Sequence, residues 1–111
     1  MKKFRVALNG LLLGLKDKAI LTQYIIALIV IIISLYLKLD YISLIIVIML
    51  CFLVITFEYI NTTIERTCDL ISKEYNDKIK YIKDLAAGFV LLQAILSVIV
   101  AIILFINMKG I

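Results

Sequence analysis

Hydrophobic residues fill three long stretches of this 111-residue chain, and polar segments separate them. The uncharged stretches cover residues 19–37, 41–57 and 85–108. Each is close to the ~20 residues that an α-helix needs to cross a bilayer. The middle stretch reaches that length if Glu58 lies at the membrane interface. The pattern therefore predicts an all-α membrane protein with spans at about 19–37, 41–60 and 85–107.

Residues 1–17 have a different, amphipathic pattern that predicts a helix lying on the membrane surface. The apolar positions that recur at helical spacing are Phe4, Leu8, Leu11, Leu12 and Leu15. Gly10 and Gly14 form a Gly-x-x-x-Gly pair, which leaves two interpretations open. The pair allows another helix or a lipid to approach closely, or it is simply two glycines tolerated in a surface helix.

Composition and charge agree with a membrane protein of one domain, residues 1–111. The chain is 65% hydrophobic, has a mean hydropathy of +1.16 and contains no proline or internal repeat. Lysine and arginine concentrate before residue 19 and between residues 66 and 84. The positive-inside rule predicts that both segments face the cytoplasm. The net charge of +4 fits contact with anionic membrane lipids, and no basic-aromatic groove indicates nucleic acid.

The two cysteines, Cys51 and Cys68, lie on one predicted helix about 25 Å apart, which is too far for a disulfide. We expect free thiols. The chain has no histidine and no Cys-x-x-Cys pair, so it does not indicate zinc.

The polar residues that follow the second hydrophobic stretch share one helix face. If the helix continues, Glu58, Asn61, Glu65 and Asp69 fall within an arc of about 80° along about 16 Å. Three carboxylates on one face repel each other and are costly to desolvate. The arrangement therefore predicts a cation among them. The alternative is a solvated extension of the helix, in which acidic residues are common.

The residue types on this face suit phosphoryl transfer at a membrane. Glu58 is the deepest carboxylate and suits a general base. Glu65 is better hydrated and suits a Mg²⁺ ligand, because Mg²⁺ takes one or two carboxylates beside water and phosphate. Lys83 can contact a phosphate, and Asp84 can accept a hydrogen bond from a nucleotide. Together they indicate transfer from a nucleotide to a membrane alcohol.

These residues also carry a resemblance to a known family. The matching positions are Glu58-x-x-Asn61-Thr62-x-Ile64-Glu65-x-x-x-Asp69, Glu74-Tyr75 and Lys83-Asp84-x-Ala86-Ala87-Gly88-x-Val90-Leu91-Leu92. They resemble the small bacterial integral-membrane lipid kinases, diacylglycerol kinase and undecaprenol kinase. The resemblance covers about residues 57–95, and the remainder agrees in architecture.

The resemblance implies a homotrimer with active sites shared between subunits, ATP as phosphoryl donor, Mg²⁺, and a lipid alcohol as substrate. Glu58 matches the family's catalytic base, and Glu65 matches the residue that holds metal with ATP. Further matches surround the nucleotide or support the site: Asn61, Asp69, Glu74, Tyr75, Asn76, Lys83 and Asp84. Some members have histidine at position 76.

One departure concerns a second metal-binding glutamate that the family places after the surface helix. Lys18 occupies that position here, with Asp17 just before it. Three possibilities are open. Asp17 takes the metal after a one-residue shift, Lys18 contacts phosphate directly, or the metal site is weakened.

Three functions follow from these patterns. The first is a lipid kinase, for which residue usage typical of an AT-rich genome favours undecaprenol over diacylglycerol. The second is a catalytically impaired paralogue that acts as a membrane partner or regulator. The third is a small proton-coupled transporter, because a membrane-embedded glutamate can couple protons to export.

Overall fold

The computed structural model describes residues 2–74 and 76–108 and consists of four helices in that part of the chain. They are α1 (Lys2–Gly14), α2 (Lys18–Tyr36), α3 (Tyr41–Ile71) and α4 (Asp77–Met108). The last three are long and apolar enough to cross a membrane. The prediction of a surface helix followed by three membrane-spanning helices is therefore confirmed at the level of helix number, order and composition.

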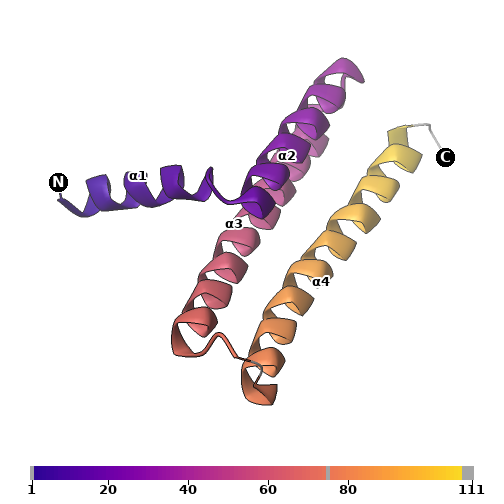
Figure 1. Cartoon of the computed structure of the whole chain (residues 1–111). Helices are drawn as coiled ribbons and strands as arrows, with labels where there is room; N and C mark the ends of the chain where they lie inside the picture. Colours follow the sequence, from indigo (N-terminus) through magenta and orange to yellow (C-terminus); the bar gives the residue numbers. More distant parts are fainter. Residues whose placement is uncertain (1, 75, 109–111) are drawn as a thin grey trace.

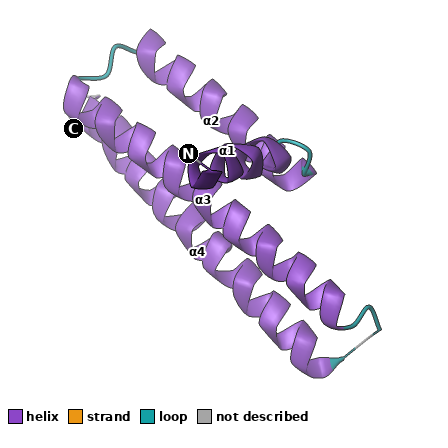
Figure 2. Cartoon of the chain, turned by 90° about the vertical axis from the view of Figure 1, so that its left-hand side faces the viewer, coloured by secondary structure: helices purple, strands orange, loops and turns teal. Residues whose placement is uncertain are grey.

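α3 is the central element. α2 and α4 each pack antiparallel against it, while α1 turns sharply away from the start of α2 (Figure 1). The 37–40 turn and the end of α4 lie at one end of the helices, and the 72–76 connection lies at the other (Figure 2). We call the end that carries the 72–76 connection the polar end, because lysine and acidic residues concentrate there.

α3 continues well past its hydrophobic stretch. It ends at Ile71, so residues 58–69 extend the preceding helix as predicted. α4 likewise begins at Asp77, eight residues before the predicted span at 85. α1 ends at Gly14 rather than residue 17, because Asp17 is the N-cap of α2: its Oδ1 accepts a hydrogen bond from the Ile20 amide at 3.1 Å.

The 37–40 turn is fixed by the chain's own polar groups. Lys38 has a φ of 57°, and its amide and that of Leu39 donate to the Leu35 and Ser34 carbonyls. This pattern is a Schellman ending of α2, for which glycine is the usual residue. Asp40 then caps α3, and its hydrogen bonds from the Ser43 side chain and amide lower the pKa of Asp40.

Few apolar side chains are buried within the chain itself. Among residues 2–74 and 76–108 they are Ile20, Ala27, Val47, Cys68 and Ala86, whereas most leucines and isoleucines of the long helices are exposed. A surface of this kind is compatible with lipid or with other subunits. Cys51 and Cys68 are both free, as expected.

Candidate active site

The acidic face of α3 changes from buried to exposed toward the polar end. Glu58 is only 8% exposed, Asn61 is half-buried, and Glu65 is exposed. The Asn61 amide nitrogen donates to Oε1 of Glu65 at 3.2 Å. The other amide atom, Oδ1 of Asn61, is buried and has no hydrogen-bond partner. Asn61 therefore orients Glu65 and still presents one unsatisfied acceptor.

α4 contributes a lysine to the same face. Lys83 Nζ lies 2.7 Å from Oδ1 of Asp69, so the structure brings these two predicted site residues together. Both lie outside the predicted spans 41–60 and 85–107. The hydrogen bond from Lys83 lowers the pKa of Asp69, and the same bond raises the pKa of Lys83. Lys83 is therefore a charged ammonium group beside the acidic face.

Asp84 lies on another side of α4. It forms an ion pair with Lys80, one turn before it, at 2.5 Å. It also lines a groove of about 730 Å³ with Ile64 of α3 and Tyr81 of α4. Ile64 is about 100° around α3 from Glu65. A single copy of the chain thus joins Lys83, but not Asp84, to the acidic face.

The junction of α1 and α2 lies against the opposite flank of that face. Oδ2 of Asp17 is 3.5 Å from a guanidinium nitrogen of Arg66, and Oδ1 of Asp17 caps α2. Both carboxylate oxygens of Asp17 therefore already have partners. Lys18 is the exposed first residue of α2. Arg66, which the sequence patterns did not single out, adds a third charge to this junction.

The remaining predicted site residues belong to the 72–76 connection. The Glu74 amide donates to the Ser72 hydroxyl at 3.2 Å, and Glu74 is exposed. Asn76 caps α4, because its Oδ1 accepts from the amides of Lys78 and Ile79 at 2.9 and 3.3 Å. Tyr75 lies outside the described residues.

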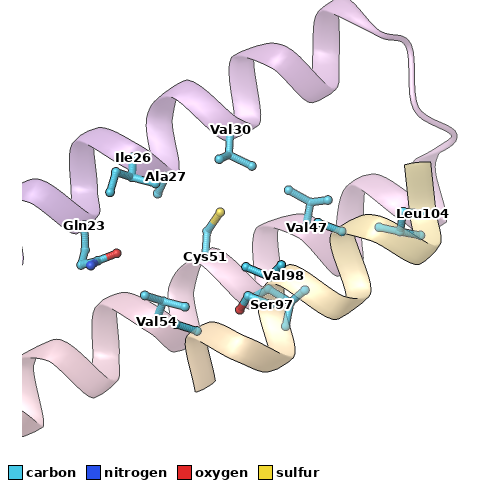
Figure 3. A pocket seen from close by; sticks show the side chains of 13 residues that line it. Gln23, Ile26, Ala27, Val30, Val47, Cys51, Val54, Ser97, Val98 and Leu104 are labelled. Atoms are coloured by element: carbon cyan, nitrogen blue, oxygen red, sulfur yellow. The ribbon is translucent and has the colours of Figure 1, made fainter. Parts of the chain in front are cut away.

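An apolar cleft of about 280 Å³ lies between α2, α3 and α4. Its α3 wall includes Val47, Cys51 and Val54, which lie on the same helix face as Glu58. The cleft extends from Gln23 and Val54 to Val47 and Leu104 (Figure 3). Tyr24 contacts Tyr59, which puts the neighbouring Gln23 at the level of Glu58. The sequence patterns did not single out this wall, although its residues lie four, seven and eleven positions before Glu58, a spacing that places them on the Glu58 face.

The oxygen ligands on α3 suit Mg²⁺ held jointly with a nucleotide. In the two described ranges, 2–74 and 76–108, no three acidic or cysteine side chains are close enough to hold a metal by themselves. Mg²⁺ does not need such a cage, since it keeps several waters and binds phosphate. The Glu65 carboxylate can serve as one metal ligand, and the unsatisfied Asn61 oxygen can accept a hydrogen bond from a metal-bound water. Asp17 fits less well, because its oxygens are already engaged.

Comparison with known families agrees with this geometry. The model of the prokaryotic diacylglycerol kinase family matches residues 5–105, which is nearly the whole chain. The chain belongs to the prokaryotic diacylglycerol kinase family. No individual curated protein matches it significantly. Family membership supports a membrane lipid kinase over a proton-coupled transporter.

Proposed function

We propose that this protein is a Mg²⁺-dependent lipid kinase that transfers the γ-phosphate of ATP to a lipid alcohol. One observation carries the proposal beyond family membership. A buried carboxylate, Glu58, continues the α3 face that walls an apolar cleft, and Glu65 follows two turns later. A lipid chain in the cleft would place its hydroxyl group between the membrane and the polar end, beside Glu58.

In this proposal, Glu58 accepts the proton of the lipid hydroxyl group. The lipid oxygen forms a bond to the γ-phosphorus, the bond from that phosphorus to the bridging oxygen of ADP breaks, and ADP leaves. Mg²⁺ held by Glu65 would neutralise phosphate charge. Asn61 holds the Glu65 carboxylate, and Lys83 exchanges its bond to Asp69 for a phosphate oxygen.

The remaining parts of the proposal follow the family resemblance. The polar end and the amino terminus face the cytoplasm, where ATP is available, and undecaprenol is the preferred lipid. Asp69, Glu74, Tyr75, Asn76 and Asp84 surround the nucleotide or support it. Three copies form the enzyme. Asp84 favours a shared site, because it lies away from the acidic face of its own chain and would serve a neighbouring copy.

A second candidate is a catalytically impaired member of the family. Its motivation is specific: Lys18 replaces the expected glutamate, and both oxygens of Asp17 already have partners. A chain of this kind would keep the architecture as a membrane partner or regulator and would not turn over ATP.

The direct test is phosphorylation by the purified protein in detergent with ATP and Mg²⁺, using undecaprenol and diacylglycerol in parallel. We expect phosphorylated lipid, with faster turnover on undecaprenol. Glu58→Gln should lower turnover by a factor of about 10² or more, because the general base is lost. Asp77→Asn removes an exposed carboxylate at the same end of the protein and should leave turnover nearly unchanged. No product from either lipid would rule out the kinase.

A further inference from the structure

Tyr59, the residue after Glu58, joins three helices through its hydroxyl group. Tyr59 Oη donates to the Leu11 carbonyl of α1 at 2.8 Å and lies 2.8 Å from Tyr24 Oη of α2. A tyrosine hydroxyl has one proton, and the Leu11 carbonyl can only accept. Tyr24 must therefore donate to Tyr59, which in turn donates to Leu11. The bonds form an ordered chain from α2 through α3 to α1.

The Leu11 carbonyl is one that the end of α1 leaves unpaired. The Leu15 amide, which would bond to Leu11 in a continuing helix, bonds to Leu12 instead at 3.1 Å. The last carbonyls of a helix need partners from outside it. Tyr59 supplies such a partner, so α1 ends where α3 can cap it.

The absence of a side chain at Gly14 leaves room for the Tyr59 ring. Gly14 is buried, and a Cβ atom there would overlap the ring atoms of Tyr59. Gly10, one turn earlier, has open space around it. Each interpretation of the Gly-x-x-x-Gly pair therefore applies to one glycine: Gly14 permits a close approach, and Gly10 is simply tolerated in the helix.

The same flank of α3 carries a second contact to the junction. Arg66 is seven residues after Tyr59, hence on the same face, and it pairs with Asp17. The Arg66 side chain is 72% exposed, so this pair stabilises little. Tyr59 is half-buried, and its ring meets that of Tyr24 edge to face with centroids 6.3 Å apart. The tyrosine contact is therefore the main attachment.

We propose that Tyr59 is a positioning residue that holds the α1–α2 junction, with Asp17 and Lys18, beside the acidic face. This inference rests on the proposed kinase function. The residues of the junction reach the phosphates of ATP only while the junction stays fixed on α3. Tyr59 therefore acts on nucleotide affinity through the junction and has no contact with the reacting atoms.

The test compares Tyr59→Phe with Tyr36→Phe, which removes the hydroxyl of a tyrosine that is 83% exposed at the far end of α2. Tyr59→Phe removes both hydrogen bonds of the hydroxyl group, and loss of the one to Leu11, worth about 1 kcal/mol, predicts a KM for ATP raised about fivefold or more. The KM for the lipid should stay within about twofold, and Tyr36→Phe should resemble the wild type. Gly14→Ala displaces the ring while keeping its hydroxyl and should raise the KM for ATP as well.

A second measurement does not depend on turnover. Spin labels at Arg5→Cys and Leu70→Cys, in a chain with both native cysteines replaced by serine and diluted with unlabelled protein, report the distance between α1 and α3. A narrow distribution in the wild type that broadens in Tyr59→Phe supports the inference. An unchanged distribution, or a broadened one with an unchanged KM for ATP, would overturn it while the kinase stands. A wild type without turnover on either lipid would remove the kinase assignment and the positioning role together.

Discussion

At the scale of single residues, the most informative departure from the family pattern is the set of charges at the α1–α2 junction. Asp17, Lys18 and Arg66 bring one negative and two positive charges to the flank of the acidic face. Arg66 occupies the carboxylate that could otherwise replace the missing glutamate. The junction therefore suits phosphate better than a second metal ligand, since a protonated lysine cannot coordinate Mg²⁺.

Lys18→Glu tests this interpretation. The new carboxylate would be exposed and would have no capping role, so under the proposed function it is available to the Mg²⁺ that Glu65 would hold. We expect the Mg²⁺ concentration for half-maximal turnover to fall about tenfold, equivalent to 1.4 kcal/mol. Lys16→Glu makes the same charge change two residues away and should shift this Mg²⁺ concentration far less. Equal shifts in both variants would indicate only a change of net charge. A large gain in maximal turnover would favour the impaired paralogue as the natural state.

At the scale of helices and turns, the 37–40 turn contains one unfavourable backbone conformation. Lys38 adopts a φ of 57°, which costs a residue with a Cβ about 1 kcal/mol. Lys38→Gly should therefore raise the free energy of unfolding by about that amount, measured by thermal or denaturant unfolding in detergent. Lys38→Ala removes the same charge but keeps the Cβ. If both variants have equal stability, the left-handed conformation at position 38 does not lower the free energy of unfolding.

The number and order of the helices and the acidic face were predictable because they depend on local spacing. The run of apolar residues up to Phe57 and the three- and four-residue spacing after Glu58 sufficed to predict the extended α3. The contact between Tyr24 and Tyr59 was not predictable, because it depends on how α2 is rotated against α3 over 35 residues of sequence. The side of α4 that Asp84 occupies depends on packing in the same way.

At the scale of the whole molecule, one face of α3 joins the membrane to the polar end. On this face residues 47–54 wall the apolar cleft, Glu58 follows, and Asn61, Glu65 and Asp69 complete it. α2 and α4 form the sides of that path, so the substrate and the nucleotide would meet from opposite directions at Glu58. Within a bilayer, apolar surface alone does not attract a lipid chain, because surrounding lipid is equally apolar. Under the proposed function, the cleft would therefore act by orienting the lipid chain through its shape.

Filling the cleft should thus raise the KM for the lipid without changing the KM for ATP. Ala101 lines it from α4, and Ala101→Phe would occupy the space of a lipid chain. We expect the KM for the lipid to rise about tenfold, equivalent to 1.4 kcal/mol, with the KM for ATP nearly unchanged. Ile103→Phe adds an aromatic ring at a position that is 59% exposed and does not line the cleft, and it should have little effect. Equal losses in both variants would mean that the helices are disturbed generally. An unchanged KM for the lipid in Ala101→Phe would place the lipid chain outside the cleft, and Glu58 would then have to receive its substrate from the outer surface of α3.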